Sequence, residues 1–124
     1  MTRKMLAPGA ALLFALSLNL MAAGGGANTW KGYVTDTWCG LNRAQAAPTA
    51  ECTVSCVKGH HAKYAFFNFA DQKVYVLNPQ NLAARYAGQK VVVKGTAGGQ
   101  EQFQTEKGPA TGAVITASSI TPER

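Results

Sequence analysis

Five short runs rich in β-branched and aromatic residues, separated by turn residues, set the architecture of this chain. They are WKGYVTDTW (30–38), HAKYAFFNF (61–69), KVYVLN (73–78), QKVVVKGT (89–96) and GAVITASSI (112–120). Within these runs apolar side chains alternate, which predicts β-strands with one face buried. The short polar turn between the second and third runs predicts that these two strands form a hairpin.

Two further segments have the features of short helices. The first is 49–59, where Thr49 suits an N-cap and Gly59 suits the stop at the C-terminus. The second is 79–88, with a proline at its first position and Asn78 as its expected cap. The polar, glycine-rich segment 97–112 is predicted to be a long loop between the last two strands.

The order of these elements predicts an all-β fold, a five-stranded Greek-key barrel of the OB-fold type. In that fold a helix lies between the third and fourth strands, as 79–88 does here. The helix 49–59 is then an insert between strands one and two. Barrel closure also removes the exposed edges that five strands in so short a chain would otherwise present. The competing architecture is an open α+β sandwich.

The first 27 residues are predicted to be a signal peptide rather than part of the domain. MTRK is a positively charged start, an apolar run follows, and small residues up to Ala27 suit cleavage. A membrane-anchoring helix is the alternative, but Pro8, Gly9 and Asn19 interrupt the run. We therefore expect a domain at 28–124, periplasmic or secreted, with no transmembrane segment after cleavage.

The charge of the predicted mature domain is mildly basic and diffuse. Removing Arg3 and Lys4 from the 12 basic residues leaves ten against 6 acidic residues, a net charge of +4. The lysines are scattered rather than gathered in a block, so solubility accounts for the charge without a polyanionic partner. Nucleic acid is not expected as a ligand of an exported protein.

The three cysteines, Cys39, Cys52 and Cys56, suit a disulfide staple in an oxidising compartment. Residues 52 and 56 on one helix would have Cβ atoms about 5–6 Å apart, too far for a disulfide. We therefore expect Cys39 to pair with one of them, 13 or 17 residues further along the chain. Closing such a loop stabilises a fold by about 3 kcal/mol.

The same cysteines also allow a metal site. Two thiolates on adjacent helical turns can both reach one ion, with Cys39 as a third ligand and His60 or His61 as a fourth. Three sulfurs and one imidazole would suit zinc, and an all-sulfur set would suit copper(I). A thiol–disulfide redox protein is a weaker alternative, since the chain has no C-x-x-C pair. No catalytic residues are predicted.

Exposed aromatic residues are the candidates for a ligand-binding face. Tyr64, Phe66 and Tyr75 would share one face of the hairpin, and Phe103 lies alone in the polar segment. OB-folds bind oligonucleotides and oligosaccharides on the face of strands two and three, where aromatic rings stack on the ligand. In a closed barrel one face of the hairpin must be the interior, so core packing is the favoured interpretation for the first three and a ligand face is the alternative.

The cysteine pattern and the strands together resemble a family of small exported bacterial proteins of uncharacterised function. The shared pattern is D-x2-C-G, then C-x3-C-x3-G, followed by OB-like strands. The matching residues here are Asp36, Cys39, Gly40, Cys52, Cys56 and Gly59. Members often carry a histidine shortly after the C-G pair, whereas 41–45 has none. The resemblance implies no activity.

Taken together, the sequence predicts an exported, non-catalytic binding or structural module of the cell envelope, held by a disulfide. Its partner would be an envelope ligand or protein that the sequence does not identify. The alternative is a periplasmic zinc- or copper-binding module.

Overall fold

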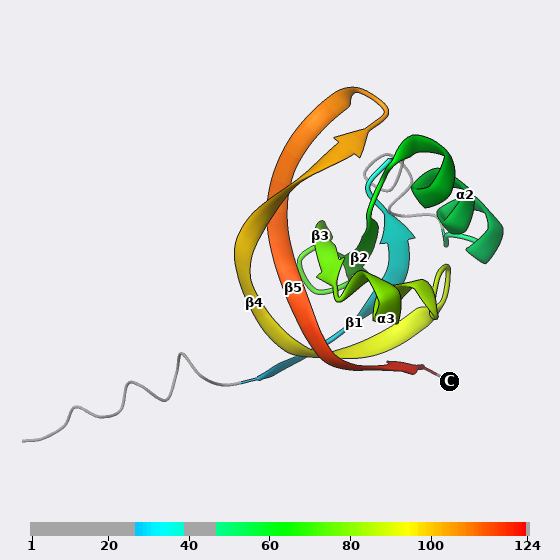
Figure 1. The fold of residues 1–124 in the computed structure, drawn as a ribbon. Helices are drawn as coiled ribbons and strands as arrows, with labels where there is room; N and C mark the ends of the chain where they lie inside the picture. The colour runs from blue at the N-terminus through cyan, green and yellow to red at the C-terminus, as the bar shows by residue number, and fades with distance from the viewer. Residues whose placement is uncertain (1–26, 39–46, 124) are drawn as a thin grey trace, which may run out of the picture.

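The computed structural model of the protein describes residues 27–38 and 47–123, and residues 1–26, 39–46 and 124 lie outside this description. Five strands form a closed barrel in the order β1-β2-β3-β5-β4 (Figure 1). Their bounds are β1 Asn28–Asp36, β2 Tyr64–Asn68, β3 Lys73–Asn78, β4 Lys90–Thr105 and β5 Gly108–Pro122. Neighbouring strands are antiparallel except β3 and β5, which run parallel. This topology confirms the predicted OB-like barrel and excludes the open sandwich.

The interior of the barrel is one continuous apolar cluster. Val34, Phe66 and Tyr75 stand opposite one another across β1, β2 and β3. Val34 and Phe66 are fully buried, and Tyr75 packs against them half-buried. Val91 and Val93 of β4 complete the cluster, which confirms their predicted inward position. Lys90 and Lys94, which alternate with them along the strand, are exposed to solvent. The hairpin face that the sequence could not assign is therefore settled, with Phe66 pointing inward.

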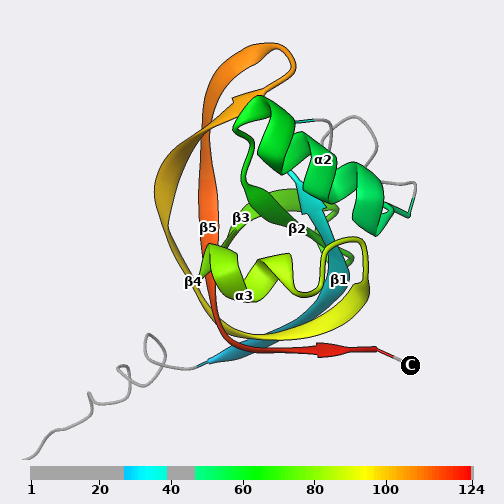
Figure 2. The ribbon, with the colours of Figure 1, turned by 45° about the vertical axis from the view of Figure 1, so that its right-hand side comes forward.

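Helix α3, Gln80–Ala84, closes one end of the barrel (Figure 2). It is shorter than the predicted 79–88, although Ala83 and Ala87 both contribute to the core. The predicted cap by Asn78 is wrong: the N-cap is Pro79, and no side chain caps this helix. The side chain of Asn78 is instead bonded to a distant strand, as described below.

Helix α2, Ala50–His60, is the predicted insert between β1 and β2. Thr49 is its N-cap, with the side-chain oxygen accepting from the Cys52 amide at 3.1 Å. The helix passes through Gly59 instead of stopping there, and His61 takes the left-handed conformation that ends it, with φ 58°. Glycine favours that conformation but is not required for it, which explains the shift of two residues.

Gly88 fixes the place where α2 meets the barrel. Its φ of +77° is the left-handed conformation, and an added Cβ would lie 2.3 Å from the Ala50 amide nitrogen. The Gly88 amide also donates to the carbonyl of Val34 in β1 at 2.8 Å. A residue without a side chain is therefore needed both by the backbone conformation and by the close approach of α2.

The prediction of a loop over 97–112 is wrong. β4 and β5 continue through it as a long two-stranded ribbon that turns between Thr105 and Gly108 and curves back toward α2 (Figure 1). The register shifts between Ala97 and Gln100, at a pair of glycines with positive φ. This bulge lets the strand bend, and polar residues are tolerated because alternate residues of the ribbon are exposed to solvent, whereas those between them are only half-buried.

The predicted signal peptide and Cys39 fall outside the described residues. Among the residues that are described, no helix is long and apolar enough to cross a bilayer.

Candidate functional site

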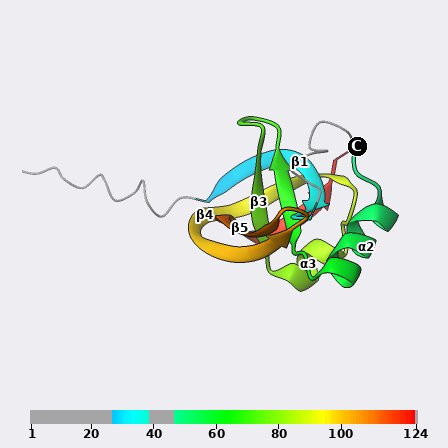
Figure 3. The same cartoon turned by 90° about the horizontal axis from the view of Figure 1, so that it is seen from above.

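A groove of about 450 Å³ opens at the end of the barrel where β1 begins and β2 ends. It is lined by Thr29, Trp30, Lys31, Asn68, Phe69 and Ala70. β1 pairs with β2 only from Gly32 onward, while its first residues pair with β4 alone. The tip of the β2–β3 hairpin therefore projects from the barrel, on the side away from the two helices (Figure 3). The divergence of these strands creates the groove.

Aromatic rings continue from the groove along the outer face of β1 and β2. Tyr33 meets Phe69 edge to face with ring centroids 5.0 Å apart, and Phe67 meets Phe69 at 6.1 Å. Tyr33 and Phe69 are half-buried, so part of each ring is open to solvent. The Lys90 ammonium lies 6.0 Å from the centre of the Phe69 ring, at the limit for a cation–π contact. Rings held in this way offer stacking surfaces at little entropic cost.

The surface around the groove is positively charged. Lys31 and Lys90 share one carboxylate, that of Glu123, at 3.1 and 3.6 Å. The lysine ammonium groups, Lys31 first, lower the pKa of Glu123 below its ordinary value. Lys94, opposite Thr29 on β4, is exposed. Three lysines against Glu123 and Asp71, which follows the groove residue Ala70, leave this end of the barrel with a small positive excess.

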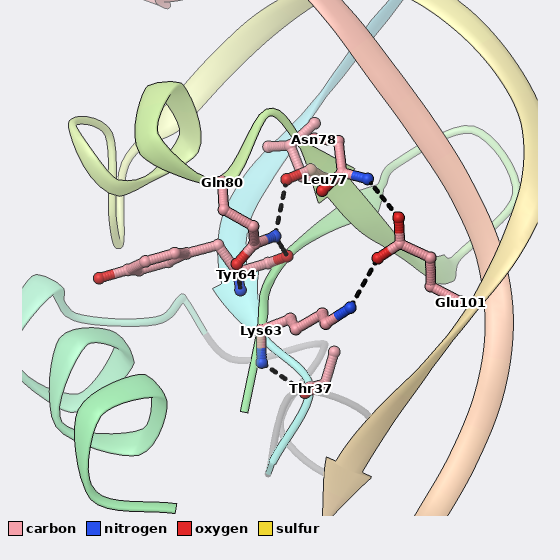
Figure 4. Close-up of polar contacts among 7 residues, drawn as sticks. All are labelled: Thr37, Lys63, Tyr64, Leu77, Asn78, Gln80 and Glu101. Atoms are coloured by element: carbon pink, nitrogen blue, oxygen red, sulfur yellow. Dashed lines mark hydrogen bonds and ion pairs between the residues drawn. The ribbon is translucent and has the colours of Figure 1, made fainter. Parts of the chain in front are cut away.

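At the other end of the barrel a polar network ties the ribbon to the outer face (Figure 4). Glu101 of β4 accepts from the Lys63 ammonium at 2.7 Å and from the Asn78 side-chain amide at 2.6 Å. The buried Thr37 hydroxyl donates to the Gln104 carbonyl and accepts from the Lys63 amide, both at 3.0 Å. Both hydrogen bonds of Glu101, the one from Lys63 first, lower the pKa of this carboxyl.

The ribbon therefore covers part of the surface that OB-folds use for ligands. Lys63, Asn78 and Thr37 alternate with inward residues, so they mark the outer face at the places where the ribbon is bonded to it. Ala65 and Val76, on the same face, are 0% and 1% exposed. The part of the outer face that stays open is the end with Tyr33, Phe69 and the groove.

The ion pair of Glu101 predicts a pH-dependent contribution to stability. The folded pKa lies below the ordinary 4.5, so ionised Glu101 stabilises the folded chain above pH 4.5. This stabilisation is lost as the pH falls through the folded pKa. Because both partners are about one-third exposed, we expect Glu101→Gln to cost about 1 kcal/mol or less at pH 7 and less at pH 3 than at pH 7. Urea unfolding at both pH values measures this difference.

A double-mutant cycle with Lys63→Met provides the control for this prediction. If the ion pair carries the effect, the two substitutions together cost less than the sum of each alone at pH 7, and this difference becomes smaller at pH 3. Additivity at both pH values would show that Glu101 and Lys63 do not interact energetically.

A second, smaller pocket of about 260 Å³ lies between the end of α2 and the ribbon. It brings together two residues that the sequence singled out separately, His61 and Phe103, with Lys63, Gln102, Gln104 and Pro109. Phe103 packs over Gly112 of β5, so its ring is half-buried within the ribbon itself. With Lys63 already bonded to Glu101, this pocket offers His61 as its remaining ionisable side chain among the described residues.

The other aromatic candidates belong to the core. Tyr64 and Phe66 are 7% and 0% exposed and pack within the barrel, as the favoured core interpretation expects, and not on a ligand face. Tyr75 is half-buried against the same cluster, and its hydroxyl donates to the carboxylate of Asp71. This hydrogen bond raises the pKa of Tyr75. The physical reason is barrel closure, which turns this face of the hairpin inward.

The cysteine-bearing helix is held against the end of β1. The His60 ring stacks on Trp38 with centroids 4.0 Å apart and planes 8° from parallel. Cys56, one helical turn before His60, is buried, and Cys52 is half-buried. No disulfide joins Cys52 to Cys56 in the described helix, in keeping with the helix geometry.

The metal hypothesis rests on Cys39, which falls outside the described residues. Among residues 27–38 and 47–123, no three cysteine, histidine or acidic side chains gather as a metal-binding group. His60 and His61 also diverge, since His60 stacks on Trp38 while His61 lines the second pocket.

Family models, curated proteins and solved structures contain no match to this chain.

Sequence reasoning missed Trp30, Lys31 and Phe69. The sequence pattern could have indicated Phe69, because alternation along β2 places Phe67 and Phe69 on the face of the strand that does not carry the inward Phe66. The groove itself depends on where β1 leaves β2, and no local pattern in the sequence encodes that point.

Proposed function

We propose that this protein is an exported, non-catalytic binding module of the cell envelope, stapled by a disulfide from Cys39 to the α2 helix. The observation that carries the binding role is the groove bounded by Trp30 and Phe69, at an end of the barrel that the ribbon does not cover. A concave apolar surface with a few polar groups is the usual form of a ligand site. OB-folds bind extended ligands on this face.

The stack of Trp38 on His60 supports the staple and its pairing. Cys39 follows Trp38 directly in the chain, and Cys56 lies one helical turn before His60 on the same face of α2. Cys52 lies a further turn away. The contact at Trp38 therefore favours Cys56 as the partner of Cys39.

Thermal unfolding with a reductant or a chelator tests the staple against the metal alternative. Dithiothreitol is expected to lower the Tm by more than about 10 °C, because opening a loop of this length costs about 3 kcal/mol. EDTA is expected to leave the Tm unchanged. The opposite result, sensitivity to EDTA but not to dithiothreitol, would replace the staple with a metal site.

Single cysteine variants test the pairing. Cys56→Ser is expected to unfold at the Tm of the reduced wild-type protein and to lose its response to dithiothreitol. Cys52→Ser, the matched control on the same helix, is expected to keep that response. If the two variants exchange these behaviours, the bond runs from Cys39 to Cys52.

A further inference from the structure

We propose that the groove beside β1 binds an extended, acidic polypeptide segment by adding it as a strand to the edge of β1. This inference rests on the proposed binding function and names the class of partner for the same groove. It follows from the hydrogen-bonding pattern of β1, from the apolar walls and from the charge around them.

The first residues of β1 present an edge without a neighbouring strand. Phe69 donates its amide to the Lys31 carbonyl at 3.0 Å, so the backbone of Lys31 faces β2. Backbone groups alternate along a strand, and the N–H and C=O of Thr29 therefore point to the same side. The β1–β2 ladder begins only at Gly32, so no described strand pairs with β1 beside Thr29. A peptide backbone matches such an edge, because its donors and acceptors repeat every two residues.

The walls and charges select the side chains of that peptide. Trp30 lies on the inward side of β1, packed against the core, whereas Phe69 lies on the outer side of β2, so the two rings offer apolar contact on opposite faces of an added strand. Lys31, Lys90 and Lys94 lie around the groove, and the carboxylates of Glu123 and Asp71 are their nearest described counter-charges. Asp71 keeps its negative charge while it accepts from the Lys73 amide at 3.0 Å and from the Tyr75 hydroxyl, so the positive excess around the groove is small. Alternating acidic and apolar residues fit these groups.

The test is a titration of the oxidised full domain with defined peptides, followed by amide NMR. The first probe is a blocked hexapeptide of alternating glutamate and valine. We expect saturable binding, with shifts of the Thr29 and Lys31 amides, and affinity that falls as salt rises. A lysine–valine hexapeptide is expected to bind at least about tenfold more weakly. Equal binding of both peptides would overturn the charge argument.

A third probe separates strand addition from surface adsorption. It is the same glutamate–valine peptide with N-methyl groups on alternate amides, which keeps the charge but removes the donors along one edge. Loss of binding is expected, and unchanged binding would overturn the proposal. Oligogalacturonate, an acidic glycan without peptide groups, is the fourth probe. If it binds at this groove and the peptides do not, the partner is a glycan and the proposal is wrong.

Two variants assign the site. Phe69→Ala is expected to weaken peptide binding about tenfold, and Lys31→Gln about threefold. Lys107→Gln, which removes the same charge at the tip of the ribbon, is the matched control and should not change affinity. Equal effects of Lys31→Gln and Lys107→Gln would contradict the proposal. If the glycan binds and the peptides do not, the peptide proposal fails but the proposed binding function stands. If the Tm depends on metal, the disulfide-stapled module is wrong, whatever the peptide titrations show.

Discussion

Replacing Gly32 by alanine is expected to destabilise the barrel by about 3–5 kcal/mol. Gly32 lies where β1 pairs with both neighbours, opposite Asn68 of β2 and Val91 of β4. A Cβ there would lie 1.9 Å from the Phe67 carbonyl oxygen and 2.8 Å from the Phe66 ring. A backbone atom cannot rotate away, so the ladder itself must open.

Equilibrium unfolding in guanidinium measures this effect, and Gly59→Ala provides the matched control. Gly59 lies inside α2 with nothing within 4 Å of an added Cβ. Alanine there is expected to stabilise the protein by about 0.5–1 kcal/mol, because it favours the helix over the unfolded chain. A Gly32→Ala protein as stable as the wild type would show that β1 does not pass this close to β2.

Replacing Phe66 by alanine is expected to cost about 3–5 kcal/mol, because the ring is fully buried and its loss leaves a cavity. Phe103→Ala is the matched control, since this ring is half-buried on the exposed ribbon. It is expected to cost about 1 kcal/mol or less. Denaturant unfolding of the two variants gives both values.

The comparison also decides between the two roles that the sequence allows for Phe66. If the ring stood on a ligand face, its removal would leave the free energy of unfolding nearly unchanged and would affect only binding. Equal stability of Phe66→Ala and the wild type would therefore contradict the assignment of this hairpin face to the interior.

Much of the fold could be predicted from local patterns. The alternation in KVVVK fixed the inward face of β4, and Thr49 marked the start of α2. The strand order, with a helix between the third and fourth strands, was enough to indicate the barrel. These features depend on neighbouring residues, which the sequence displays directly.

The errors arose where distant residues decide the structure. Both faces of the β2–β3 hairpin are apolar, so alternation could not show whether Phe66 or Phe67 points inward. The polar composition of 97–112 concealed a ribbon that is held by Glu101 reaching Lys63 and Asn78. Likewise, the groove follows from the separation of β1 from β2, which depends on pairing across the barrel.

The most direct test of the stapled binding module is a thiol and metal count on protein purified from the periplasm without reductant. Intact mass after iodoacetamide should show one alkylated cysteine before reduction and three after it, and elemental analysis should find no stoichiometric zinc or copper. Three alkylated cysteines before reduction, with one metal ion per chain, would contradict the account.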